Sequence, residues 1–353
     1  MKTLPKTRSL LQRLEEGAAI CAEGYLFELE RRGYLQAGAF VPEVVLEHPE
    51  VVAALHREFV RAGSDVIEAF TYYAHRGKMQ LIGKEELLEP LQKNALETAK
   101  SVAAEAEGER PLVAGNICNT NVWDPSDRAT DAQVSAMFDE QVAWAFDANV
   151  DFMIAETLSF FGEAKLALES IKRAGLTAVV TFAHHLGESL RDGIPLDEAA
   201  KQLEQAGADV IGVNCIRGPD TMLPDITIIR KAVSCHVAAL PVPYRTTELQ
   251  PTFQSIRDPD CSCLPDDRPF PTALDPFTCN RYEMAAFARK ALDMDVRYLG
   301  VCCGAGPHHI RSIAEELERM PPASKYSPDM SKHYALGMDP RLKQHNRDFA
   351  KKL

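Results

Sequence analysis

Eight short apolar runs, separated by longer segments with helical spacing, constrain the fold of this chain more than any other feature. A short apolar run followed by a helical pattern is typical of a βα unit, and a series of such units builds a parallel sheet. Eight units favour a closed sheet, so the sequence predicts an α/β fold, a (β/α)₈ TIM barrel. The predicted strands are 19–23, 66–70, 112–116, 152–156, 178–182, 210–214, 237–240 and 298–301.

The segments between these runs have apolar residues on one stripe, as expected of helices that cover a sheet. The clearest predicted helices are 42–62, 86–106, 131–146, 282–292 and 309–320. Two segments break the rhythm: 244–277 is rich in Pro, Asp and Thr, and 321–353 is polar without a clear period. We therefore predict a barrel over residues 1–320 with a long functional or mobile loop, followed by a C-terminal arm over 321–353.

Composition narrows the class of protein. A single barrel of this type commonly reaches the length of 353 residues. The formal charge of -12 argues against nucleic acid or an anionic membrane as a partner. No apolar stretch approaches 18 residues, and the first residues lack the apolar run of a signal peptide. Nine cysteines are an odd number for a disulfide framework, so we expect a cytoplasmic protein with some metal-binding thiols.

Residues whose side chains can take part in catalysis or bind a ligand lie where the predicted strands end. In (β/α)₈ barrels the active site lies at the C-terminal ends of the strands. The residues at or just beyond these ends are Glu23, Tyr72, Tyr73, Asn116, Glu156, His184, Cys215, Cys302 and Cys303. Their common position supports the predicted fold and indicates one shared site.

Three of these residues are cysteines. Cys302 and Cys303 follow one predicted strand, and Cys215 follows another. Adjacent cysteines do not readily pair with each other, because their Cα atoms are only about 3.8 Å apart. Three soft thiolates select Zn²⁺, which prefers four ligands and would keep one position open for a substrate. A thiol entering that position loses its proton, so we expect alkyl transfer to sulfur.

Such a reaction needs an alkyl donor with a good neutral leaving group, which indicates an onium methyl group. Aromatic faces hold cations of this kind. Tyr72 and Tyr73 after the second strand, Phe40 and Tyr25 are the candidates for this cage. Since adjacent residues of a strand face opposite ways, one of the two neighbouring tyrosines is expected in the core.

The segments 212–215, Gly-Val-Asn-Cys, and 300–304, Gly-Val-Cys-Cys-Gly, resemble the metal-binding signature of the zinc-dependent homocysteine S-methyltransferases, the betaine-homocysteine S-methyltransferase family. The likeness extends from residue 11 to about 339 and includes 29–34, 56–64, 152–156 and 321–324. It implies Zn²⁺ on Cys215, Cys302 and Cys303. It also implies methyl transfer from an onium donor, glycine betaine or a sulfonium such as dimethylsulfoniopropionate, to homocysteine, which gives methionine.

The resemblance also implies roles for single residues. Glu156 matches the family's glutamate for the homocysteine ammonium group, and Tyr73 matches its donor-site tyrosine, so both are expected to be catalytic. The substrate site is expected to include Glu23, Gly24, Tyr25, Phe40, Tyr72 and Asn214. The family assembles through its C-terminal arm, so a homo-oligomer, a dimer or a tetramer, is expected.

The chain departs from the family pattern on the substrate side. Ala22 stands where the family has an aspartate, and Glu23 comes one residue later, so it can substitute only if the backbone bulges or bends at Gly24. Further departures are Thr157 for a tyrosine, Phe40 for a tryptophan, Leu240 for a glutamine, and His333 and His345 out of register with a donor-carboxylate histidine. Two alternatives therefore stay open: methylation of another thiol, and a zinc-containing onium-binding paralogue without turnover. A further alternative is a second metal site at Cys261, Cys263 and Cys279.

Overall fold

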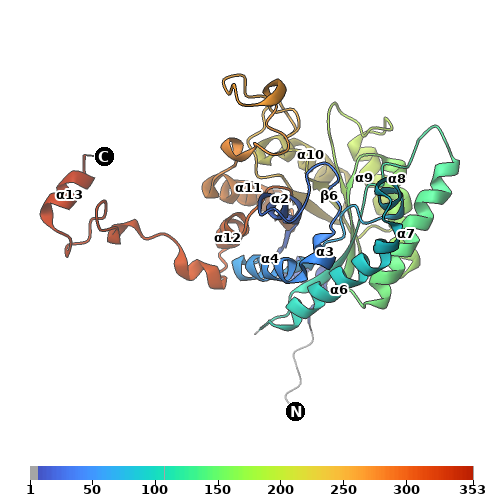
Figure 1. Cartoon of the computed structure of the whole chain (residues 1–353), viewed down its shortest axis with the longest axis horizontal. Helices are drawn as coiled ribbons and strands as arrows, with labels where there is room; N and C mark the ends of the chain where they lie inside the picture. Colours follow the sequence, from blue (N-terminus) through green and yellow to red (C-terminus); the bar gives the residue numbers. More distant parts are fainter. Residues whose placement is uncertain (1–6, 107, 353) are drawn as a thin grey trace, which may run out of the picture.

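The computed structural model describes residues 7–106 and 108–352. Eight parallel strands form a closed barrel in chain order, with helices outside (Figure 1). β8 pairs with β1 from Ala19↔Tyr298 to Ala22↔Val301, which closes the ring. The strands are β1 Ala19–Ala22, β2 Val66–Glu68, β3 Leu112–Cys118, β4 Phe152–Leu158, β5 Ala178–Phe182, β6 Val210–Asn214, β7 His236–Leu240 and β8 Tyr298–Val301. The predicted (β/α)₈ barrel is confirmed, and each predicted strand overlaps an observed one.

Most helices follow the strands around the outside of the barrel, whereas α1 precedes β1 and α13 lies away from the barrel. They are α1 Leu10–Glu16, α2 Tyr25–Arg31, α3 Val44–Glu47, α4 Pro49–Ala62, α5 Arg76–Ile82, α6 Leu88–Ala104, α7 Ala129–Asp147, α8 Phe161–Arg173, α9 Leu196–Gln205, α10 Pro219–Ala232, α11 Arg281–Asp293, α12 Pro307–Glu316 and α13 Gln344–Ala350. The predicted helix 42–62 is two helices, because His48 precedes Pro49 and takes a non-helical φ of -142°. No helix within 7–106 or 108–352 is long and apolar enough to cross a membrane.

Strand side chains alternate between two cores. One cluster holds the residues that point into the barrel, such as Cys21, Val66, Ile154 and Tyr298, and α1 contributes two leucines to it. The other cluster joins the outward-facing residues, such as Ala22, to the surrounding helices. This alternation decides which polar residues at the strand ends continue into the barrel interior.

The two segments that break the alternation of strands and helices, 244–277 and 321–352, differ in how they pack on the barrel. The connection between β7 and α11 folds over the barrel: Phe253 and Ile256 are buried, and the Phe253 amide donates to the Ile216 carbonyl at 2.9 Å. The segment after Pro321 leaves the barrel and ends in α13 (Figure 1). Its large apolar side chains are exposed, among them Tyr326, Tyr334, Leu336, Met338 and Phe349.

Candidate metal centre and active site

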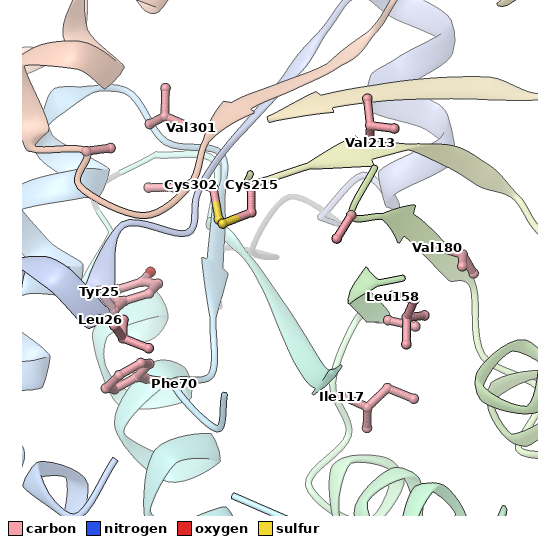
Figure 2. Close-up of a cluster of buried hydrophobic side chains, with 14 of the residues drawn as sticks. Tyr25, Leu26, Phe70, Ile117, Leu158, Val180, Val213, Cys215, Val301 and Cys302 are labelled. Carbon is pink, nitrogen blue, oxygen red and sulfur yellow. The ribbon is translucent and has the colours of Figure 1, made fainter. Parts of the chain in front are cut away.

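The three predicted ligand cysteines meet at the end of the barrel. The sulfur atoms of Cys215, Cys302 and Cys303 all lie within 4.8 Å of one another. Those of Cys302 and Cys303 are 3.9 Å apart. Figure 2 shows the side chains of Cys215 and Cys302 pointing toward each other from β6 and β8. These strands are not neighbours, because β7 lies between them.

The backbone around the cysteines explains their convergence. The amides of Cys215 and Cys302 donate to carbonyls at the end of β7, those of Leu240 and Pro241, each at 2.9 Å. Cys215 then turns with a φ of 56°, and Gly304 has a φ of 90°. A Cβ atom on Gly304 would collide with the Tyr244 ring and hydroxyl, so glycine is required for this approach. β7 thus aligns both cysteine-bearing turns.

The trio fits a metal ion. The three cysteines are free thiols, and two of them are buried. Hydrogen bonds from the thiols of Cys302 and Cys303 lower the pKa of Cys215, whereas burial raises the pKa of Cys302. The cluster therefore favours one thiolate stabilised by two thiols, and a soft divalent cation would replace those two protons. Three sulfur ligands also leave room for a fourth.

Beside the sulfur atoms, five polar side chains form one hydrogen-bonded chain. Asn116 Nδ2 donates to Glu156 Oε1 at 2.7 Å and also to Glu68. Asn214 Nδ2 donates to Glu156 Oε2 at 2.8 Å and to Glu23 Oε2 at 3.3 Å. The three carboxyl side chains are at most 6% exposed. Sequence reasoning missed Glu68, although a lone acid in an apolar strand was the available signal.

This set of five hydrogen-bonded side chains, called the acidic chain below, has no positively charged partner among the described residues. Burial raises the pKa of Glu156 to about 7 and raises the pKa values of Glu23 and Glu68. Among the ion pairs of the described residues, none includes any of these glutamates. Oε1 of Glu23, Oε2 of Glu68 and Oδ1 of Asn116 are buried without a hydrogen-bond partner. An incoming cationic group would satisfy these atoms and offset the cost of burying the carboxylates.

Glu23 reaches this chain without a bulge, because β1 keeps its register with β8 through Ala22; of the two expected features it is the bend that is present, at Gly24, which precedes α2 with a φ of -81° and a ψ of 17°. Cys21 points into the barrel, and Ala22 packs into the outer core. Glu23 continues the inward alternation of Cys21. Gly24 has a different reason to be glycine, since a Cβ atom there would lie 2.5 Å from the Ala305 carbonyl oxygen.

A cavity of about 190 Å³ adjoins the sulfur trio and includes Cys215 and Cys303 in its wall. Its aromatic wall consists of Phe27, Phe40, Tyr72, Tyr73, Phe253 and Phe270. The rings of Tyr72 and Tyr73 lie 4.4 Å apart, and both line the cavity. The expectation that one of them lies in the core is therefore wrong. β2 ends at Glu68, and Tyr73 turns with a φ of 62°, so strand alternation no longer applies there.

Tyr25 is not brought to the cavity. It begins α2 and is 2% exposed, with its hydroxyl 3.2 Å from His56 Nδ1. Its ring packs against Phe59 and Phe70, and Figure 2 shows Tyr25 beside Phe70, away from the sulfur atoms. Tyr25 therefore stabilises the packing of α2 on α4.

The remaining cysteines and histidines separate into structural and cavity residues. Cys261 and Cys263 are bonded to each other, and Cys279 is a separate buried thiol, so the alternative of a second metal site there is wrong. His184 is buried, with Nδ1 2.8 Å from Asp225. Among the described residues that line the cavity are His185, Ser159 and Arg191, but not His184, the strand-end histidine expected at the site.

Known proteins share this architecture. Solved structures include the homocysteine methyltransferase MmuM of Escherichia coli in its metallated form. That structure has a TM-score of 0.67 and 19% identity, and the match covers 86% of this chain and 97% of that one. It supports the fold.

The sequence comparisons are more specific. Betaine–homocysteine S-methyltransferase 1 of Danio rerio is 37% identical over 325 residues, which are 90% of this chain and 77% of that protein. S-methylmethionine–homocysteine S-methyltransferase of Pongo abelii is 36% identical over 333 residues, 90% of this chain and 85% of the relative. The family profile described as homocysteine S-methyltransferase matches residues 22–317. The chain is therefore a methyltransferase and belongs to the homocysteine S-methyltransferase family.

Proposed function

We propose that this protein transfers a methyl group from an onium donor, glycine betaine or a sulfonium, to the sulfur of homocysteine, giving methionine. The observation that carries the proposal is a group of three thiols within 4.8 Å of one another, two of which, Cys215 and Cys303, lie in the wall of an aromatic cavity. The relatives named above act on homocysteine with betaine or S-methylmethionine as the methyl source.

Cys215, Cys302 and Cys303 are proposed to hold Zn²⁺. When bound, zinc supplies a Lewis acid that lowers the pKa of an acceptor thiol, so that the acceptor sulfur is a thiolate at neutral pH. The three ligands must be reduced for this purpose. A reducing compartment such as the cytoplasm therefore suits the protein.

The acidic chain is proposed to bind the ammonium group of the acceptor. Glu156 lies in its centre, hydrogen-bonded on one side to Asn116 and on the other to Asn214. Glu23 supplies the second carboxylate in place of the aspartate lost at Ala22. Its free Oε1 and the proximity of its carboxylate to the Cys302 sulfur, within 4.8 Å, support this role.

The aromatic wall is proposed to hold the donor. Tyr72, Tyr73 and Phe40 offer ring faces to an onium group, and such faces attract cations most strongly where water is excluded. Phe253 closes the wall from the β7–α11 connection. These residues orient the methyl carbon toward the acceptor sulfur, and this positioning is the main task left to the protein.

The experiment is a methyl-transfer assay with zinc-loaded protein and homocysteine. Donors are glycine betaine, dimethylsulfoniopropionate and S-methylmethionine, and the product is methionine, measured by mass spectrometry. Methionine formation with at least one donor, abolished by a chelator and restored by Zn²⁺, is the expected result. Metal-loaded protein that yields no methionine with any donor contradicts the proposal.

A second candidate function is methylation of a different thiol. Glu68 favours it, because a third buried carboxylate beside Glu23 and Glu156 offers more negative charge than one ammonium group requires. A panel of thiols with zero, one and two amino groups, assayed with one donor, separates the candidates. Homocysteine should give the highest kcat/KM if the first proposal holds.

We also propose that the arm from Pro321 onward contacts a second copy of the chain. Its side chains of Tyr326, Tyr334, Leu336 and Phe349 are exposed, and exposed apolar residues in such number mark an interaction surface. Light scattering of the full chain and of a chain ending at Met320 tests this role. A homo-oligomer that becomes a monomer on truncation is expected.

A further inference from the structure

The charged side chains in the wall of the proposed donor cavity are of one sign only. Among the described residues that line it, Arg191 is the single lysine or arginine, and none is an aspartate or glutamate. A donor that carried only an onium charge would be repelled by this guanidinium and would find no carboxylate to offset the repulsion. A negative charge on the ligand would offset this repulsion.

Arg191 is held in place but left without an ion-pair partner. Its backbone amide donates to the Ser159 carbonyl at 2.9 Å, and its guanidinium carbon lies 4.5 Å from the centre of the Phe160 ring. None of the ion pairs formed by the described residues includes Arg191. Oε1 of Glu163 accepts hydrogen bonds from the backbone amide and the hydroxyl of Thr120. The guanidinium is therefore available to a ligand.

Two neutral groups stand in the same wall. His185 Nε2 and Ser159 Oγ share a hydrogen bond of 3.0 Å, and both residues line the cavity with Arg191. An imidazole and a hydroxyl next to a guanidinium form a common set of hydrogen-bonding groups for a carboxylate. Among the described residues of the lining, none belongs to the C-terminal arm.

We propose that Arg191, with His185 and Ser159, binds the carboxylate of a zwitterionic donor that carries one methylated onium group and one carboxylate. This inference rests on the proposed methyl transfer. The onium end lies against the aromatic wall, and the carboxylate pairs with the guanidinium, so the bound donor is neutral overall. A donor with an additional ammonium group finds no acid in this cavity and is disfavoured. The carboxylate anchor thus comes from the β4–α8 and β5–α9 connections of the same chain.

The test compares donors with and without a carboxylate in wild type and in Arg191→Met. Glycine betaine and dimethylsulfoniopropionate carry the carboxylate, trimethylsulfonium lacks it, and S-methylmethionine adds an ammonium group. Loss of a charge-assisted, bidentate contact should reduce kcat/KM for the two zwitterions about 100-fold. Trimethylsulfonium should change less than about threefold, because it makes no such contact.

Two variants serve as controls. Arg191→Lys keeps the charge and should recover part of the lost kcat/KM, and Arg173→Met removes an exposed arginine of α8 that pairs with Asp139, away from the cavity. Equal loss with all donors, or no loss with the zwitterions, overturns the carboxylate subsite while leaving methyl transfer intact. Calorimetric titration of glycine betaine keeps the test independent of turnover. Binding by wild type that is lost in Arg191→Met supports the subsite, and unchanged or absent binding overturns it.

Discussion

The side-chain amide of Asn214 lies 2.8 Å from the carboxylate of Glu156, and the next residue in the chain is the ligand candidate Cys215. The amide cannot rotate freely, because its oxygen accepts hydrogen bonds from the Thr157 amide and the Thr181 hydroxyl, each at 2.9 Å. One residue at the end of β6 therefore fixes both the acidic chain and the sulfur trio. The two halves of the acceptor site are positioned together.

Cys302→Ala should abolish both metal binding and activity. Two thiols bind Zn²⁺ far more weakly than three, so the zinc content should fall at least about tenfold. The measurement is zinc per chain by elemental analysis, together with methionine formation. Cys235→Ala is the matched control, because Cys235 is a half-buried free thiol outside the trio. Full zinc occupancy in Cys302→Ala would show that the trio is not the metal site.

Glu23→Gln should weaken acceptor binding and spare donor binding. The substitution keeps the size of the side chain and removes its charge, so kcat/KM for homocysteine should fall about 10- to 100-fold. With 4-mercaptobutanoate, which is homocysteine without the amino group, the same variant should match wild type within about threefold. An equal loss for both thiols would assign Glu23 to support of the fold or of the metal.

Gly304→Ala should destabilise the turn that carries Cys303. Its left-handed φ of 90° costs a side chain about 1 kcal/mol, and the collision with Tyr244 adds to this cost. We expect a loss of more than about 2 kcal/mol in the free energy of unfolding, with reduced zinc content. Gly83→Ala is the control: its φ is 66°, but nothing lies within 4 Å of the added Cβ atom. Equal losses of unfolding free energy in the two variants would show that the collision with Tyr244 contributes nothing.

The buried His56 should make the protein less stable in mild acid. Burial lowers the pKa of His56 to about 3, so between pH 6.5 and 5 the unfolded chain takes up a proton that the folded chain does not. The contribution of neutral His56 to the free energy of unfolding is present above pH 6.5 and decreases as the pH falls. Wild type should lose about 1.5 kcal/mol more than His56→Gln between pH 6.5 and 5 in urea unfolding. Identical pH dependences would contradict a neutral buried His56.

The fold and the convergence of the three thiols were predictable for different physical reasons. Barrel strands are buried on both faces, so they are visible as apolar runs, and three soft ligands at strand ends indicate a metal in any barrel. The position of Glu68 in the acidic chain depends on which face of β2 points inward, and the apolar run did not show this. Arg191 lies in a loop whose path is set by contacts with Ser159 and Phe160. Tyr25 was a candidate for the cavity because aromatic faces hold cations, and the structure turns its ring toward α4.

The sulfur trio joins β6 to β8 across the intervening β7. A bound ion would link two non-neighbouring strands at the C-terminal end of the barrel. The stability of the folded protein would then depend on the metal supply, and so would its activity. If the trio holds zinc as proposed, the protein without metal would lose its activity and would also be cleaved more readily by proteases at the C-terminal end of the barrel.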